Sequence, residues 1–144
     1  MVVDTRGAYG SGRVTPQRLL IAQTAESLAG AFSVEDLEGA VRRTDDTTGQ
    51  ATVYRAVSAM VSSGWIERVG ERDGSALFAR CPAGPHHHHH VVCDGCGRVE
   101  ATECPVVVGP GDATADGFVI TRHEITLYGL CPACAAETPT GGRG

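Results

Sequence analysis

The sequence lacks lysine altogether, and its twelve basic residues are all arginine. It also lacks any stretch close to the roughly 20 apolar residues of a membrane-spanning helix, so we expect no membrane span. No apolar segment near the amino terminus indicates a secretory signal, which predicts a cytoplasmic protein with reduced thiols. The His-Glu-x-x-His motif of zinc hydrolases is missing as well. We accordingly expect neither an enzyme nor a small-molecule substrate.

Charge is distributed unevenly along the chain, whose formal net charge is −5. Residues 1–80 contain nine arginines and ten acidic residues, whereas residues 81–144 contain three arginines and seven acidic residues. The net charge is therefore −1 for the first half and −4 for the second, so most of the net negative charge lies in the second half. Nucleic-acid binding by the first half would have to come from a local patch of arginines, because no basic block is present.

Four of the six cysteines form two Cys-x-x-Cys pairs, Cys93 with Cys96 and Cys131 with Cys134. In a reducing compartment such pairs indicate metal binding rather than disulfides. Four thiolates on two tight turns form the closed, tetrahedral donor set of structural zinc. A redox-active pair is the alternative, but no thioredoxin-like strand–helix–strand pattern accompanies it. We therefore predict a structural Zn²⁺ site at these four cysteines.

The first half has the pattern of three helices followed by a hairpin. Apolar spacing and capping residues predict helices over residues 16–29, 34–43 and 50–62. Two β-rich segments, 65–69 and 75–80, flank an Asp73-Gly74 turn of the type that joins hairpin strands. Three helices and a hairpin indicate a winged helix-turn-helix, although a generic small α+β domain would give the same pattern.

A proline- and glycine-bearing break over residues 81–85 separates a second, α/β domain, so the fold class is α+β. Short strands are expected at 91–92 and 98–101, and a longer one over 118–128 with His123, Ile125 and Leu127 on one face. The predicted organisation is a flexible leader (1–13), a winged-helix domain (14–81), a hinge (82–85), a metal-binding domain (86–137) and a disordered tail (138–144).

Five consecutive histidines occupy positions 86–90. The run is internal, which argues against an expression tag and leaves a solvated loop as the simple alternative. On a strand, alternate side chains point to opposite faces, so His88 and His90 would share one face and His87 and His89 the other. One run can therefore supply two metal centres.

The remaining two cysteines lie outside the Cys-x-x-Cys pairs. Cys81 is either an inert buried thiol or the soft ligand of a Cys-His-His site, and a soft ligand favours zinc over iron. Cys104 is interpreted as a spare thiol.

These residues together resemble the ferric uptake regulator family, and within it the zinc uptake regulators. The resemblance runs from about Thr15 to Ala135. It is carried by Ala51-Thr-Val-Tyr-Arg55, by the histidine run leading into Cys93-x-x-Cys96-Gly97, and by Leu127-Tyr-Gly-x-Cys131-x-x-Cys134. It implies a homodimer, joined through the second domain, that binds double-stranded DNA with an inverted-repeat operator when metal is loaded.

The resemblance also implies residue roles. The third helix would enter the major groove, with Tyr54 contacting bases, Arg55 contacting phosphate or a base, and Gln50 and Thr52 as further contacts. From the sequence alone, without the resemblance, a core aromatic at Tyr54 and a solvated charge at Arg55 are the better interpretation. The implied regulatory metal ligands are Glu67, Cys81, His88 and His90.

A third metal site would use His87, His89 and His123 with a carboxylate. Here the chain departs from the family pattern, because the expected glutamate is replaced near Val108; Glu103 or Asp112 would have to substitute. The chain also has Ala31-Phe32-Ser33 where iron- or nickel-sensing relatives often place a histidine, which favours zinc.

The predicted function is a zinc-responsive repressor of zinc-uptake genes. The alternatives are a relative that senses iron, nickel or peroxide, and a zinc-storage protein or metallochaperone.

Overall fold

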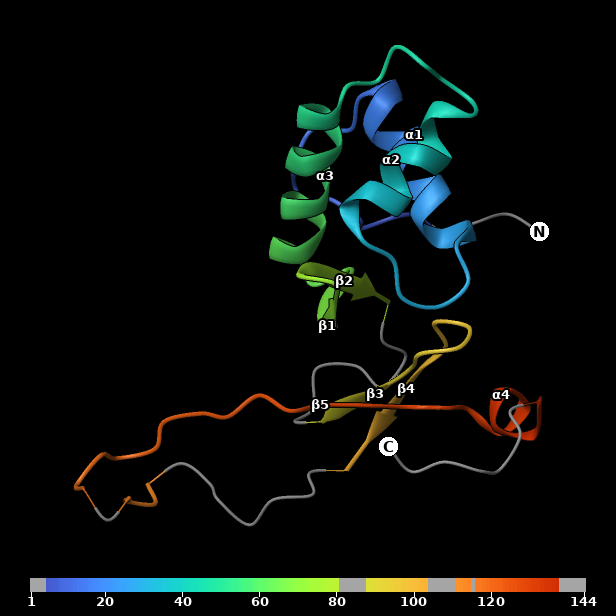
Figure 1. Ribbon diagram of the computed structural model, residues 1–144. Helices are drawn as coiled ribbons and strands as arrows, with labels where there is room; N and C mark the ends of the chain where they lie inside the picture. The colour runs from blue at the N-terminus through green and yellow to red at the C-terminus, as the bar shows by residue number, and fades with distance from the viewer. Residues whose placement is uncertain (1–4, 81–87, 104–110, 115, 138–144) are drawn as a thin grey trace.

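The computed structural model describes residues 5–80, 88–103, 111–114 and 116–137. Figure 1 shows a helical head, a hairpin below it, and a three-stranded sheet beneath the hairpin. The head contains α1 (Pro16–Ser27), α2 (Val34–Arg42) and α3 (Gln50–Ser62), and its hairpin, here called the wing, contains β1 (Glu67–Arg72) and β2 (Ser75–Ala79). The tail contains β3 (His89–Cys93), β4 (Val99–Thr102), β5 (Thr126–Gly129) and α4 (Pro132–Glu137). None of the helices in the described part of the chain is long and apolar enough to cross a bilayer.

The first two helices of the head begin where their capping residues predict. The Thr15 hydroxyl accepts a hydrogen bond from the Arg18 N–H, with Pro16 as the first helical residue. Ser33 and Asp36 form a reciprocal capping box at the start of α2. The helices enclose one apolar core, whose fully buried side chains include Ile21, Leu37, Val41, Val53 and Met60.

The wing is the predicted hairpin. Its strands are antiparallel and turn at Asp73 and Gly74, which have φ angles of 51° and 80°. The pairing register shifts between Arg68 and Gly70, which marks a β-bulge in β1. Val69, Leu77 and Ala79 of the wing form a second buried apolar cluster with Val92 of β3. The wing therefore packs on the tail sheet as well as on the head.

The tail sheet has the order β4-β3-β5, with β4 antiparallel and β5 parallel to β3. His90 lies opposite Thr126, and Val92 lies opposite Tyr128. Side chains at paired positions share a face, so these four residues lie on one side of the sheet. Because Val92 belongs to the apolar cluster of the wing, that side faces the wing.

Two segments differ from the sequence prediction. Residues 5–12 are not a free leader: Ala8 and Tyr9 are 1% and 6% exposed and belong to the core of the head. The Tyr9 hydroxyl donates to the Arg18 carbonyl at 2.6 Å, which fixes the ring on α1. The long strand predicted over 118–128 is also wrong, since β5 comprises only Thr126–Gly129. Over residues 111–114 and 116–125, which the structure describes, the chain is irregular apart from one bridge between Ala113 and Val119.

Helix α4 was not predicted, while α1 and α2 end two residues and one residue earlier than expected. The predicted hinge and the predicted disordered tail lie outside the described residues.

Candidate metal centres and nucleic-acid interface

Four cysteines meet at one end of the tail sheet. Cys93 ends β3, Cys96 lies in the turn before β4, and Cys131 and Cys134 lie at the start of α4. Their sulfur atoms all lie within 4.8 Å of one another, and Sγ of Cys96 is 3.8 Å from Sγ of Cys131. A tetrahedral zinc ion with Zn–S bonds of about 2.3 Å holds its sulfurs about 3.8 Å apart. The donor set and its spacing therefore fit structural zinc.

Hydrogen bonds around the four sulfur atoms change the pKa values of two of these thiols in opposite directions. The Cys131 N–H donates to Sγ of Cys93 at 3.3 Å, and this and other main-chain hydrogen bonds lower the pKa of Cys93 to about 6. The pKa of Cys134 is instead raised to about 12, first by side-chain hydrogen bonding with Cys131 and then with the other two sulfurs. Negative charge on one sulfur opposes ionisation of its neighbours, and a divalent cation removes that opposition.

A second group of donors joins the wing to the tail. Oε1 of Glu67, on β1, lies 3.3 Å from Nε2 of His88 and 2.9 Å from Nε2 of His90. Both imidazoles are largely buried, whereas the Glu67 side chain is 40% exposed. Nitrogen and oxygen ligands at about 2.0–2.2 Å from zinc lie about 3.3–3.5 Å apart in a tetrahedron. The first distance fits, and the second would lengthen by a few tenths of an ångström. Cys81 lies outside the described residues.

The pocket around this group has a volume of about 440 Å³. It is lined by the three donors and also by Thr126 and Tyr128 of β5. The sequence analysis assigned no role to these two residues. Their alternation in the strand was the available signal, but without the parallel pairing of β5 with β3 it could not place them beside His90.

The histidine run divides between two faces as its alternation predicts. His89 points away from Glu67, and its Nε2 lies 3.0 Å from Nε2 of His123. The Ile125 N–H donates to Nδ1 of His89 at 3.3 Å, so in neutral His89 the proton is assigned to Nε2, which donates to His123. His87 and Val108 lie outside the described residues. Within the described residues, two groups of three or more possible metal ligands are present, and the His89–His123 pair belongs to neither.

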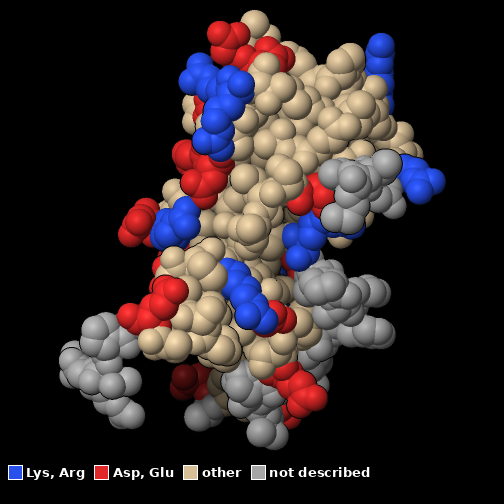
Figure 2. All heavy atoms as spheres, turned by 90° about the vertical axis from the view of Figure 1, so that its right-hand side faces the viewer, with Lys and Arg blue, Asp and Glu red and all other residues tan. Residues whose placement is uncertain are grey.

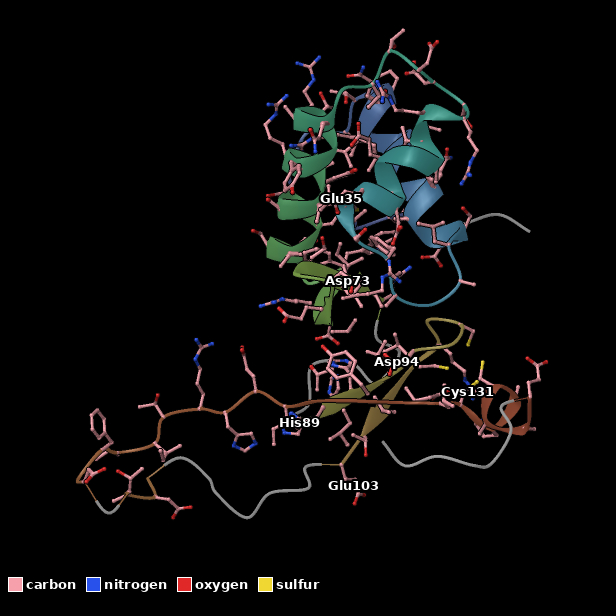
Figure 3. The ribbon with its side chains drawn as sticks, in the orientation of Figure 1. Glu35, Asp73, His89, Asp94, Glu103 and Cys131 are labelled. Carbon is pink, nitrogen blue, oxygen red and sulfur yellow. The ribbon has the colours of Figure 1, made fainter. Side chains whose placement is uncertain are left out.

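Figure 3 shows that the four-cysteine site and the histidine run lie at different ends of β3. The sulfur atoms gather near Cys131 beside α4, while His89 lies toward the other end of the sheet. Strand β3 connects them, because it begins with His89 and ends with Cys93.

Helix α3 exposes the residues predicted to contact DNA. Gln50, Tyr54 and Arg55 are exposed and Thr52 is half-buried. The opposite side of the helix faces the core with Val53, Ala56, Val57 and Met60. Tyr54 is 48% exposed, so it is not the core aromatic that the sequence alone allowed. Nη2 of Arg55 lies 3.4 Å from the Thr52 hydroxyl, so these two polar side chains are neighbours on the helix surface.

The described residues on the face shown in Figure 2 do not form one continuous basic surface. Basic and acidic side chains lie close together on that face. Elsewhere in the described residues, ion pairs such as Arg72–Asp36, Arg80–Glu26 and Arg98–Glu100 likewise join arginines to carboxylates. This face is the one turned away from α3, so it is not the surface on which the recognition helix lies.

Comparison with known proteins shows which class this fold and these sites define. Residues 10–128 match the ferric uptake regulator family. The chain belongs to that family. Within it, the chain groups with the zinc uptake regulators. The zinc uptake regulation protein of Mycobacterium tuberculosis (strain ATCC 25618 / H37Rv) is 35% identical over 124 residues, which are 85% of this chain and 94% of that protein.

Two further comparisons agree. The zinc uptake regulation protein of Escherichia coli (strain K12) is 31% identical over 127 residues, which cover 85% of this chain and 72% of that protein. A solved zinc uptake regulator complexed with zinc and DNA matches with a TM-score of 0.65 and 26% identity, covering 90% of this chain and 88% of that chain.

Proposed function

We propose that this chain is a zinc-responsive, DNA-binding transcriptional repressor of zinc-uptake genes, in which Glu67, His88 and His90, with Cys81, form the regulatory metal site. It is not an enzyme, in keeping with its family. The observation that carries the proposal is the convergence of Glu67 from the wing with two imidazoles from the tail, at 2.9 and 3.3 Å. Because the proposed repressor acts on DNA, we place the protein in the cytoplasm.

The position of these ligands explains how metal would control DNA binding. Glu67 moves with the wing and the recognition helix, whereas His88 and His90 move with the tail. Bound zinc supplies positive charge and a fixed tetrahedral geometry. All three side chains can share one ion only while the wing lies against the sheet. Metal therefore favours one angle between head and tail. If DNA binds best at that angle, metal raises the affinity for DNA, and DNA raises the affinity for metal by the same factor.

A homodimer turns that angle into operator recognition. Two recognition helices must be about one turn of DNA apart to enter successive major grooves of an inverted repeat. The tail exposes apolar side chains suited to a subunit interface: Phe118 and Val119 are 72% and 66% exposed, and Leu127 and Leu130 are 41% and 45% exposed. We assign the contact between subunits to this part of the tail. The four-cysteine site keeps a structural zinc ion throughout.

The test is operator binding at buffered free-zinc concentrations. Glu67→Gln keeps the shape of the side chain but removes the charge that faces His88 and His90. We expect it to raise the zinc concentration for half-maximal DNA binding by about tenfold or more, in line with the loss of a charged contact. Cys81→Ser should act in the same direction.

Glu100→Gln is the matched control, because Glu100 is likewise a strand carboxylate, its exposed side chain is paired to Arg98, and it does not line the pocket of the regulatory site. Its zinc response should equal that of the wild type. Operator affinity that does not depend on zinc in the wild-type protein would contradict the proposal.

A further inference from the structure

Apart from the metal ligands, two side chains of β5 hold the wing against the tail. The Glu71 N–H donates to the Tyr128 hydroxyl at 2.7 Å, and the Thr126 hydroxyl donates to the Val69 carbonyl at 2.9 Å. Both partners in the wing are main-chain groups of β1, one on each side of Gly70. We call this pair of hydrogen bonds the β5 clasp. It joins the same two parts of the molecule as Glu67 and the histidines.

The approach of β5 to β1 is close enough to require glycine at position 70. A Cβ atom added to Gly70 would lie 2.7 Å from Oη of Tyr128 and 3.1 Å from Cγ2 of Thr126. The first distance is shorter than side-chain Cβ contacts in real proteins, so either the Tyr128 ring would have to leave its position or the strands would have to separate. The spacing between wing and tail is thus set by direct packing at this point.

The β5 clasp and the metal ligands occupy adjacent positions on the same strands. In the sheet, Thr126 is paired with His90, and Tyr128 is two residues further along β5. On the wing, Val69 is two residues after Glu67. Holding the backbone at Val69 and Glu71 therefore holds the Glu67 carboxylate above His88 and His90. These contacts need no metal.

We propose that Thr126 and Tyr128 are positioning residues of the metal switch, which preorganise the regulatory site by favouring the closed wing–tail arrangement before metal binds. The inference rests on the function proposed for Glu67, His88 and His90. A ligand that binds only the closed state has an apparent affinity reduced by the fraction of molecules that are closed. Weakening the β5 clasp lowers that fraction without altering any metal ligand.

Tyr128→Phe tests the inference, because it removes only the hydroxyl. A hydrogen bond contributes about 1 kcal/mol, so the free-zinc concentration for half-maximal operator binding should rise roughly three- to tenfold. Operator affinity at saturating zinc and the amount of zinc bound per chain should stay unchanged. Thr126→Val should shift the midpoint in the same direction, and it provides a second measurement should Tyr128→Phe fail to fold.

Tyr9→Phe is the matched control. It removes the same kind of hydroxyl from a 2.6 Å hydrogen bond that lies entirely within the head. We expect lower thermal stability with no change in the zinc midpoint.

A steric test is independent of the hydrogen bonds. Gly70→Ala should raise the zinc midpoint strongly in the wild-type background. In the Tyr128→Ala background the added methyl group no longer meets Oη, so the same substitution should raise the midpoint less. Equal effects in both backgrounds would overturn the inference.

The remaining outcomes separate the two proposals. One outcome is that the wild type responds to zinc while Tyr128→Phe and Thr126→Val have the same free-zinc concentration for half-maximal operator binding as the wild type. In that case the β5 clasp has no positioning role. Loss of operator affinity at saturating zinc in these variants would likewise overturn it. A wild type whose operator binding ignores zinc would instead refute the function proposed for the regulatory site.

Discussion

Tyr54 is an aromatic side chain on α3 that the core does not use. Its 48% exposure on a helix with a fully packed opposite side indicates a role in contact with another molecule. A hydrogen bond from such a side chain contributes about 0.5–1.5 kcal/mol, and apolar contact of its ring with a thymine methyl group adds to it. We therefore expect Tyr54→Ala to weaken binding to a specific operator by about tenfold or more, measured by fluorescence anisotropy at saturating zinc.

The thermal stability of Tyr54→Ala should remain close to that of the wild type, because the side chain is not in the core. Ser58→Ala, at another exposed position of α3, is the control and should bind like the wild type. Unchanged operator affinity in Tyr54→Ala would remove this residue from the DNA interface.

Single residues also mark how far the sequence could be interpreted. The four cysteines could be identified as a metal site because Cys-x-x-Cys spacing is local. Glu67 could be assigned only through the resemblance, because a solvated strand carboxylate is nearly as good an interpretation of that residue. Its contact with His90 spans 23 residues of sequence and depends on how the wing packs on the tail. Thr126 and Tyr128 were missed for the same reason.

The start of α2 illustrates an element whose stability depends on charge. Burial by itself raises the pKa of Asp36, but hydrogen bonds from Ser33 and from Arg72 outweigh it and hold the pKa below its ordinary value of 3.8. The charged form is thus stabilised in the folded state. Its contribution is present above pH 3.8 and is lost as the pH falls through the lower, folded-state pKa.

Asp36→Asn should therefore reduce the free energy of unfolding at neutral pH by about 0.5–1 kcal/mol, as expected for an acidic residue in the first turn of a helix. In urea unfolding series the difference from the wild type should begin to shrink as the pH falls below about 4, where Asp36 of the unfolded chain takes up a proton. It should vanish only below the lower folded-state pKa, where Asp36 is neutral in both states. Asp46→Asn, in the exposed loop before α3, is the control. A difference that stays constant down to pH 3 would show that the charge of Asp36 is not responsible.

Elements with strong local signals were predicted well. Helix α3 and the Asp73-Gly74 turn appear where apolar spacing and turn chemistry, respectively, place them. The segment 118–125 was predicted as strand from its β-branched residues, but strand formation also needs a partner. In this chain β3 pairs with β5 only from Thr126 onward. The packing of Tyr9 was missed because the carbonyl that accepts its hydrogen bond belongs to Arg18, nine residues later in the sequence. The glycines at positions 10 and 12, which lie between them, gave no sign that the chain folds back.

At the scale of the whole molecule, the two halves are stabilised differently. The head has a large apolar core of its own. Among the described tail residues, the buried apolar side chains are Val92 and Cys93, and Val92 packs against the wing. The tail therefore relies on its zinc site and on contact with the head, including the 2.7 Å hydrogen bond from the Ala31 N–H to the Gly97 carbonyl beside the cysteines.

Complete zinc removal should accordingly unfold the tail and spare the head. Structural zinc contributes about 10–16 kcal/mol of binding free energy in small domains, more than the tail core can replace. After strong chelation we expect trypsin to cleave rapidly at Arg98 and Arg122, while most helical circular dichroism remains. Readdition of zinc should restore protection. Protection that survives verified loss of all zinc would contradict this division of stability.

The repetitive histidine segment gives the regulatory strand an unusual tolerance. The pairing of Val91 and Val92 anchors β3 from its carboxyl side, and the residues before them are identical. If one histidine were deleted, the next histidine upstream would take its place in the strand, so that an imidazole would still occupy each of the positions now held by His88, His89 and His90. An extra residue between His90 and Val91 would have the opposite effect, because a one-residue shift turns every side chain to the other face. A deletion within the run therefore keeps the side-chain type at both histidine ligands, whereas an insertion after it does not.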